Sequence, residues 1–290
     1  MKKIFCRPLA GVASLCLSIA APLASAATWT DTFLGYRYGT QFHEPSNTQD
    51  VRKHVLQFTH SSGYAVGQNF LNLDVLQSDK NDPVNGGGSG ATEFYLTYRH
   101  QLHLGKALDK DLSFGPVKEV ALTGGFDLNT KDTRFAPRKR LLVVGPTLKF
   151  DVPGFLDVSL LAAREWNHCG LGAPACPQAE ISFDTQWMLS AAWGIPFQAG
   201  PLPLKFQGFI NYIGDKGKDY AGVKTEAETL MRTSLMADLG QLAGSRKNTV
   251  WAGVGYELWL NKFGNHANAA GVTKPGINTR APTLQLEWHF

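Results

Sequence analysis

The stretch EFYLTYRHQLHL, which runs from Glu93 to Leu104, decides the fold class of this 290-residue chain. Apolar side chains occupy Phe94, Leu96, Tyr98, Leu102 and Leu104, and the alternate positions are Glu93, Tyr95, Thr97, Arg99, Gln101 and His103. A helix with this order would have no apolar stripe, whereas a strand would have one apolar and one polar face. A tilted strand needs roughly ten residues to cross the hydrocarbon layer of a membrane. The pattern therefore predicts a membrane-spanning β-strand.

The same alternation recurs at 120–128, 183–193, 204–212 and 283–290. Short links fall near 61–64, 152–154 and 195–201, and long links rich in Gly, Asn and Pro fall at 40–53, 79–91, 130–139, 167–179, 214–226 and 262–279. The link at 105–117 is the exception, because it is long where a short one is due. Short turns at one end and long loops at the other are typical of bacterial barrels with an even number of strands. The chain is predicted to be all-β, a transmembrane antiparallel up-and-down β-barrel of about twelve strands with both termini on the periplasmic side.

The first residues have the features of an export signal. Lys2, Lys3 and Arg7 form a basic start, the segment 9–23 is apolar, and Ala24-Ser25-Ala26 resembles a cleavage site. A retained membrane anchor is the alternative, but the apolar run is shorter than the roughly 20 residues that a spanning helix needs. We predict a signal peptide at 1–26 and the barrel at 27–290. Loss of three basic residues lowers the formal net charge from +4 to +1, so the charge predicts no nucleic-acid partner.

The last strand carries a feature that predicts location. Leu284, Leu286, Trp288 and Phe290 fall on one face, and polar side chains fall on the other. A terminal phenylalanine on such a strand resembles the C-terminal sorting signal of outer-membrane proteins. Together with the export signal, it predicts a protein of the bacterial cell outer membrane that contacts lipid. A soluble periplasmic β-sandwich with a similar last strand is the alternative.

Several segments resemble one known family of channels. DLSFGPVKE at 111–119 resembles the corresponding stretch of the nucleoside-specific channel-forming proteins, the Tsx family. YRYGTQF (36–42), YRHQL (98–102), GFDLNTK (125–131), GPTLKFDVPGF (145–155), AAWGIPF (191–197) and NKFGN (261–265) are similar to a Tsx-like branch labelled outer envelope protein. The resemblance implies a monomeric barrel of about twelve strands whose narrow lumen binds its solute. It implies nucleosides as candidate solutes, with an unrelated small polar or aromatic solute as the alternative.

Charged side chains of both signs fall on the face that would line the barrel interior. They are Asp31, Arg37, Asp74, Glu93, Arg99, Asp127, Lys149, Asp184, Lys205, Arg232, Glu257 and Glu287. Basic and acidic walls that face each other across a constriction would orient a polar or zwitterionic solute and set the ion preference. Alternatively, the charges pair with one another across a water-filled or partly plugged lumen. Both arrangements require the polar interior of a membrane barrel.

Four aromatic residues, Tyr95, Phe209, Trp251 and Trp259, fall on the same face. A ring among polar neighbours in a lumen can serve as a stacking surface for a planar solute. A register shift of one residue would move these rings to the lipid side, where aromatic girdles are expected. We identify the candidate channel-lining residues as Arg37, Asp74, Glu93, Tyr95, Arg99, Asp127, Lys149, Asp184, Lys205, Trp251, Glu257 and Glu287.

Two cysteines, Cys169 and Cys176, remain after removal of the export signal, in the segment CGLGAPAC. An oxidising compartment favours a disulfide within this loop. A metal site is the alternative, but only His168 stands at ligand spacing. We therefore predict neither a metal nor a cofactor.

Two functions of different classes fit these features. The first is an outer-membrane channel for passive diffusion of small polar solutes. The second is a lipid-modifying or phospholipase-type barrel enzyme, which would need a serine, a histidine and a carboxylate or amide near the lipid face. His100 is expected to face lipid, but no serine stands at an obviously matching outward position on a neighbouring strand. The channel is the prediction, and the protein is not expected to be an enzyme.

Overall fold

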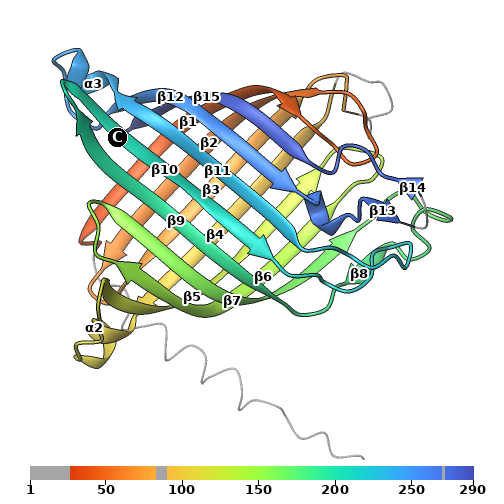
Figure 1. Ribbon diagram of the computed structural model, residues 1–290, viewed down its shortest axis with the longest axis horizontal. Coiled ribbons are helices and arrows are strands. Elements are labelled where there is room, and N and C mark those ends of the chain that lie inside the picture. Colours follow the sequence, from red (N-terminus) through yellow and green to blue (C-terminus); the bar gives the residue numbers. More distant parts are fainter. Residues whose placement is uncertain (1–26, 83–89, 270–271) are drawn as a thin grey trace, which may run out of the picture.

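Twelve long antiparallel strands form a closed β-barrel (Figure 1). The computed structural model describes residues 27–82, 90–269 and 272–290, so the predicted export signal at 1–26 lies outside the described residues. The barrel strands are β1 (Trp29–Phe42), β2 (Val51–Tyr64), β3 (Gly67–Ser78), β4 (Thr92–His103), β5 (Val117–Lys131), β6 (Arg138–Phe150), β7 (Phe155–His168), β9 (Gln186–Ala199), β10 (Leu202–Ile213), β11 (Glu228–Asp238), β12 (Val250–Leu260) and β15 (Thr279–His289). Short elements in the links are α2 (Leu104–Leu108), β8 (Glu180–Ser182), α3 (Leu239–Leu242), η2 (Lys262–Gly264), β13 (Asn268–Ala269) and β14 (Val272–Thr273).

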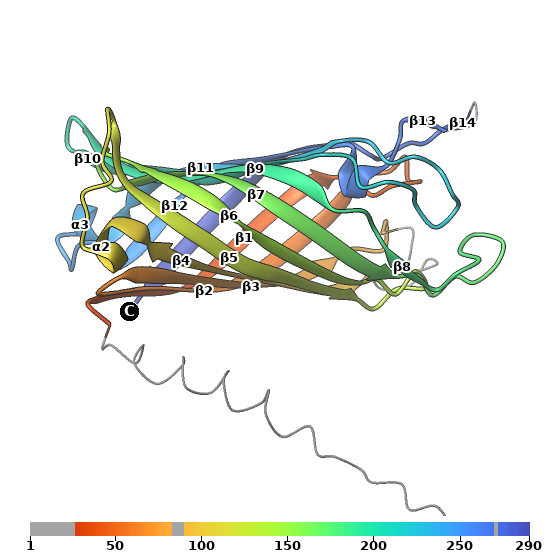
Figure 2. The ribbon, with the colours of Figure 1, turned by 90° about the horizontal axis from the view of Figure 1, so that it is seen from below.

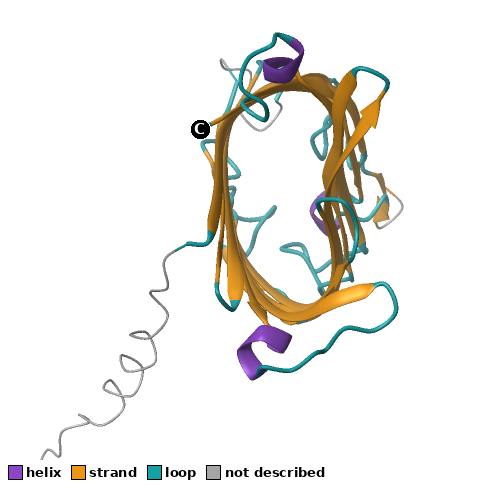
Figure 3. Ribbon diagram, turned by 90° about the vertical axis from the view of Figure 1, so that its left-hand side faces the viewer, coloured by secondary structure: helices purple, strands orange, loops and turns teal. Residues whose placement is uncertain are grey.

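Each barrel strand pairs with the strands before and after it, and the ring closes because β1 also pairs with β15. Figure 3 looks along the barrel and shows the ring as a flattened oval. This is the all-β, up-and-down architecture with twelve long strands that the sequence predicted, so the fold prediction is confirmed. Closure leaves no free sheet edge, which is what a strand-built membrane protein requires.

The two ends of the barrel differ in their links. The turn end carries the first residues of β1, the last residues of β15, the short turns at 65–66, 151–154 and 200–201, and the links that contain α2 and α3. The loop end carries the links at 43–50, 79–91, 132–137, 169–185, 214–227 and 261–278. All six long loops fall where the sequence placed them. The link with α3 is a second long connection at the turn end, which the sequence analysis had not singled out; Figure 2 shows α2 and α3 at that same end.

The two faces of the wall have opposite chemistry. On β6, Leu141 and Val143 are buried inside the barrel, while Leu142 and Val144 are exposed outside. Large exposed apolar residues on other strands are Leu34, Leu56, Phe58, Phe94, Leu122, Leu160, Leu189, Leu235, Val254 and Leu284. A continuous apolar outer surface of this kind fits the hydrocarbon layer of a membrane. Among the described residues, no helix is long and apolar enough to cross a membrane.

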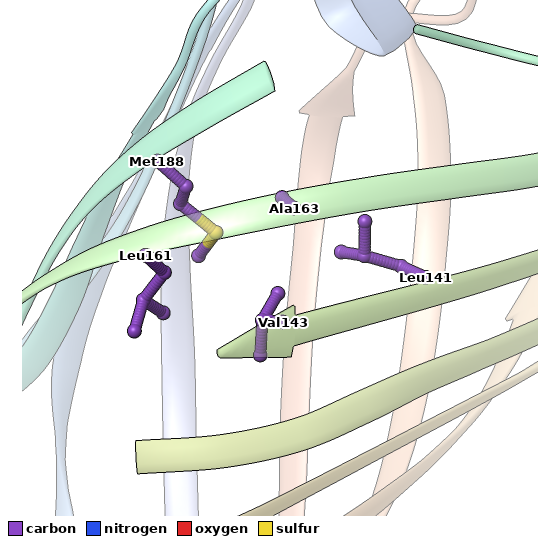
Figure 4. Close-up of a cluster of buried hydrophobic side chains, with 5 residues drawn as sticks. All are labelled: Leu141, Val143, Leu161, Ala163 and Met188. Carbon is purple, nitrogen blue, oxygen red and sulfur yellow. The ribbon is translucent and has the colours of Figure 1, made fainter. Parts of the chain in front are cut away.

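One part of the inner wall is apolar. Leu141 and Val143 of β6, Leu161 and Ala163 of β7, and Met188 of β9 form a buried cluster, against which Ile213 packs (Figure 4). The sequence predicted a polar interior throughout, and this wall differs from that prediction. It places hydrophobic packing inside the barrel, as does a smaller buried cluster of Phe42, Val51 and Ala281, while charged and hydrogen-bonded groups occupy much of the remaining inner wall.

Candidate functional site

A central cluster of charges joins opposite parts of the wall. Arg37 of β1 donates from Nη2 to Oδ2 of Asp74 on β3, at 3.2 Å. Arg232 of β11 donates from Nη1 to the same oxygen at 3.2 Å and from Nε to Oε2 of Glu257 on β12 at 2.6 Å. Four strands, β2, β1, β15 and β12, separate β3 from β11 along the shorter way round the ring. The bond between Arg232 and Asp74 therefore crosses the interior of the flattened barrel.

Strand register explains this cluster. Arg232 stands opposite Glu257 in the pairing of β11 with β12, so these two side chains meet on the same inner face. Gln57 stands opposite Asp74 in the pairing of β2 with β3 and donates to its Oδ1 at 3.2 Å. Cross-strand neighbours on one face of a sheet lie close enough to interact directly. Asp74 and Glu257 are almost fully buried, and each is neutralised by arginine.

A second cluster, the wall cluster, lies on β4 and β5. Arg99 donates from Nη1 to Oδ1 of Asp127 at 2.6 Å, and the Tyr95 hydroxyl donates to Oδ2 of Asp127 at 3.0 Å. Glu93, nearer the loop end, accepts a hydrogen bond from Nδ2 of Asn129. Lys139 of β6 lies over the Tyr95 ring, with Nζ 5.9 Å from its centroid. The ring of Tyr95 is thus fixed at its hydroxyl and flanked by a cation.

Loops close over the interior at the loop end. Glu44, in the link between β1 and β2, is buried. Its carboxylate forms ion pairs with Lys53 Nζ of β2 and with Lys262 Nζ of η2, the latter at 3.1 Å. Lys131 Nζ of β5 lies 3.9 Å from the same carboxylate. Burial would raise the pKa of Glu44, but the ammonium groups of Lys262, Lys53 and Lys131 outweigh it and hold that pKa well below its usual 4.5. We call this group, Glu44 with Lys53, Lys131 and Lys262, the loop plug.

A second loop reaches inward beside the loop plug. Lys216, in the link between β10 and β11, donates to Oε1 of Glu165 on β7 at 2.9 Å. Lys139 Nζ lies 3.6 Å from the other oxygen of Glu165. On β11 and β12, Trp259 donates from Nε1 to Glu228 at 2.6 Å. Lys262 of the loop plug lies over the Trp259 ring. Figure 3 shows loop segments within the outline of the ring, as these contacts require.

At the turn end the charges form two separate groups. Lys205 of β10 lies 3.3 Å from Glu287 of β15 and covers the Trp251 ring, with Nζ 4.6 Å from the centroid. On the opposite wall, Lys149 of β6 donates to Asp157 of β7 at 2.7 Å and to Gln101 of β4 at 2.9 Å. Both groups are salt bridges between inward-facing residues of neighbouring or nearby strands.

The structure places eleven of the twelve candidate lining residues on the inner face of a strand. Basic and acidic walls do not face each other; instead, each candidate acid on an inner strand face pairs with a base or an amide, which is the alternative arrangement. Six of the charged candidates are buried beneath neighbours, as is Trp251; they are Arg37, Asp74, Asp127, Lys149, Glu257 and Glu287. Whether these residues line a conducting path stays a prediction.

Asp184 was wrongly placed. The sequence put it on the inner face of a strand at 183–193, but β9 begins at Gln186, and Asp184 is exposed in the link between β8 and β9. Its backbone N–H bonds to the carbonyl oxygen of Lys216 in the neighbouring loop. Asp184 therefore belongs to the loops at the loop end and not to the inner face of a strand.

The loop residues Glu44, Lys216 and Lys262 are functional candidates that the sequence analysis missed. Period-two alternation assigns faces only within strands, so it could not show which loop side chains turn inward. Lys131 and Glu165 could have been found, because both stand at inward positions of strands.

The outer surface near the turn end carries a polar group around His100. Nδ1 of His100 lies 3.0 Å from Oδ1 of Asn69, and Nε2 lies 3.1 Å from the Tyr64 hydroxyl. Ser62 lines the same cavity of about 310 Å³ as these three residues. Ser62 faces outward on β2, but β3 separates β2 from β4, so Ser62 does not stand on a strand that neighbours β4.

Cys169 and Cys176 form a disulfide in the link between β7 and β8. His168 beside them lies 2.9 Å from Glu180 and 2.8 Å from Arg138, so it is engaged in an ion-pair group. Within the residues that the structure describes, no group of three or more His, Cys, Asp or Glu side chains could hold a metal ion.

Neither a protein family nor a curated protein sequence matches the chain. Among solved structures, the chain is similar to the translocator domain of autotransporter NalP from Neisseria meningitidis, with 10% identity, 95% of this chain and 93% of that chain covered, and a TM-score of 0.45. It is also similar to the β-domain of the Bordetella autotransporter BrkA (10% identity, 89% and 98% covered, TM-score 0.42) and to the KdgM porin (11% identity, 89% and 99% covered, TM-score 0.39). These relatives are outer-membrane β-barrels. Similarity to the nucleoside-specific channels stays a prediction.

Proposed function

We propose that this barrel is an outer-membrane channel through which small polar solutes diffuse passively. The contrast between the two faces of the wall supports the proposal most directly. The outside is an apolar surface that fits lipid, whereas charged groups continue through the inside from Lys53 at the loop end to Lys205 at the turn end. Charged groups within a membrane are costly to keep and generally mark a path for solutes or ions.

The interior contacts favour small solutes. Arg232 bridges the barrel to Asp74, the apolar cluster fills part of the opposite wall, and the loop plug narrows the loop end. A pore of this kind selects by width and by the polar groups along it. Solutes of the size of a monosaccharide or a nucleoside fit the proposal better than polymers.

Nucleosides are the finer part of the proposal. Tyr95 and Phe209 face the interior and stay partly accessible, so either ring could stack a base. Trp251 and Trp259 cannot, because they are buried and covered by Lys205 and Lys262. Two of the four predicted rings therefore remain as stacking surfaces.

Solute entry into proteoliposomes tests the proposal. Vesicles that contain the refolded protein should take up uridine and glucose much faster than empty vesicles and should exclude dextran. Tyr95→Ala should slow the uptake of uridine relative to glucose, and the outward-facing Leu96→Ala should leave that ratio unchanged. Uptake no faster than in empty vesicles by protein that migrates as a folded barrel would contradict the channel. If Tyr95→Ala left the ratio of uridine uptake to glucose uptake unchanged, the nucleoside part of the proposal would be wrong.

A lipid-modifying enzyme is the second candidate, and the group around His100 favours it. A hydroxyl, an imidazole and an amide in a hydrogen-bonded series can activate a nucleophile. In this arrangement Tyr64 or Ser62 would supply the hydroxyl and Asn69 would orient the ring. The purified protein should be offered labelled phospholipid in mixed micelles. The channel proposal expects no turnover, whereas turnover that His100→Ala abolishes would establish the enzyme.

A further inference from the structure

We infer that the path through this barrel selects small organic anions. The inference rests on the proposed channel and specifies the charge of its solute. It does not rest on the net charge of the interior. It follows from which member of each pair remains accessible.

In three interior ion pairs the base is accessible and the acid is buried behind it. The Arg232 side chain is 24% exposed, while those of its partners Asp74 and Glu257 are 2% and 3% exposed. The Lys205 side chain is 18% exposed and that of Glu287 is 0% exposed. The Arg99 side chain is 17% exposed and that of Asp127 is 9% exposed. A solute in the lumen therefore meets the cation first at each of these three pairs, and the half-buried Glu93, nearer the loop end, is an acid outside them.

The two arginines stand on opposite sides of the ring. β4, which carries Arg99, and β11, which carries Arg232, are separated by five barrel strands in either direction. Their clusters adjoin, because Asp74, the partner of Arg232, stands opposite Tyr95 in strand register, and Tyr95 shares Asp127 with Arg99. Because Arg232 spans the interior to reach Asp74, both guanidinium groups lie towards the wall formed by β3, β4 and β5, and a solute that passes this part of the barrel meets both.

Each arginine keeps hydrogen-bonding capacity for a solute. Arg232 uses Nε and Nη1 for its carboxylate partners, and Arg99 uses Nη1 for Asp127 and two backbone carbonyls. Within the described part of the chain, neither Nη2 group makes a hydrogen bond to protein. Guanidinium groups bind carboxylates and phosphates through paired N–H donors. The acids hold these guanidinium groups in place from the more buried side, so the accessible side of each guanidinium stays free to bind a solute.

Aromatic rings support the same cations. Arg232 lies 5.9 Å from the centroid of Phe209, and Lys205 lies 4.6 Å from that of Trp251. A ring beneath a cation stabilises its position without cancelling its charge. Lys205 is nearest the turn end of the three, so the accessible positive charges continue from the central cluster towards that end. Asp31, which pairs with His289 at the rim, is one of the exposed acids at the turn end, with Asp109, Asp111 and Asp151 of the turns.

Reversal potentials across a planar bilayer test the inference. In a potassium chloride gradient at low ionic strength, chloride is expected to be roughly tenfold more permeant than potassium, the scale of enrichment that charged clefts produce. Three probes of nearly equal size then separate charge from shape: gluconate, glucose and N-methyl-D-glucamine. Gluconate should permeate or block, glucose should pass more slowly, and N-methyl-D-glucamine should be excluded.

Substitutions assign the selectivity to the accessible bases. Arg99→Gln and Lys205→Gln should each lower the chloride preference towards parity, and Arg280→Gln, on the outer face of β15, should leave it unchanged. Arg232→Gln is not among the tests, because it takes from the buried Glu257 the arginine that hydrogen-bonds to it, whereas Asp74 keeps Arg37. Potassium preference in a conducting wild-type protein would overturn the inference while the channel proposal stands. A folded protein without conductance would overturn the channel proposal itself.

Discussion

Glu44 shows how one side chain from a loop can decide the state of the loop end. Its carboxylate lies among three lysines from three different parts of the barrel, and the opposite charges hold its pKa below the usual 4.5. A carboxyl with a lowered pKa in the folded state contributes stability above its ordinary pKa and loses it only as the pH falls towards the lowered value. The loop plug should therefore persist at neutral pH and loosen only in strong acid.

Glu44→Gln removes the charge that pairs with Lys53 and Lys262, while Lys131 keeps its ion pair with Asp82. We expect the variant to fold, to have a larger and noisier open conductance at neutral pH, and to lose the acid-induced loosening of the wild type. Single-channel recording at neutral and acid pH measures all three. Asp109→Asn, at an exposed position beside α2, is the matched control and should behave as the wild type. Equal conductance in Glu44→Gln and the wild type would show that the loop plug does not narrow the path.

Gly125 lets Arg99 lie flat against the wall. The two residues stand opposite each other in strand register, and a Cβ at Gly125 would come within 2.3 Å of the Tyr98 oxygen and 2.8 Å of Arg99 Cδ. Gly125→Ala should therefore destabilise the barrel by about 1–3 kcal/mol, as overpacking does, and should lower the anion preference. Gly124→Ala is the control, because a Cβ there meets nothing within 4 Å. Thermal unfolding in detergent measures the stability of both variants, and reversal potentials measure their anion preference. Equal results for Gly125→Ala and Gly124→Ala would contradict this role of Gly125.

At the scale of the elements, alternation was sufficient to predict the strands and their faces. In 93–103 the apolar positions face outward and the polar ones inward, apart from the outward His100, because a buried face fixes register in steps of two residues. The placement of Asp184 on an inner strand face was wrong because the alternating pattern extends from β9 back into the preceding loop. The apolar inner wall of β6 and β7 could not be predicted, since those strands are apolar on both faces and alternation gives no contrast there.

Alternation also could not predict which interior charges pair with each other. A strand pattern places Asp74 and Arg232 inside the barrel but says nothing of the distance between strands that are far apart in the ring. The flattening that brings β3 near β11 is a property of the closed sheet. For the same reason, the inward turn of Lys216 and Lys262 could be learned only from the structure.

The disulfide between Cys169 and Cys176 belongs to one loop and spans a sequence separation of 7. A closure this short should stabilise less than the ~3 kcal/mol of a 15-residue loop. Replacing both cysteines with serine should leave the unfolding temperature of the barrel nearly unchanged while proteolysis of the loop becomes faster. Limited proteolysis and thermal unfolding measure the two effects. Two reactive thiols in the oxidised wild-type protein would contradict the bridge.

At the scale of the whole molecule, one closed sheet separates an apolar outside from an ion-paired inside. Neither face alone indicates a channel, because soluble barrels can have polar interiors and membrane anchors have apolar exteriors. Their combination over twelve strands, with accessible bases in front of buried acids, is what supports conduction of small anions.

Conductance of the refolded chain in a planar bilayer tests this account most directly. The sample should first show heat-modifiable migration on gels, which identifies the closed barrel independently of function. The account predicts small, discrete and uniform current steps, as expected of a narrow path through a single barrel. Heat-modifiable protein that inserts and produces no steps above the bare bilayer would contradict it.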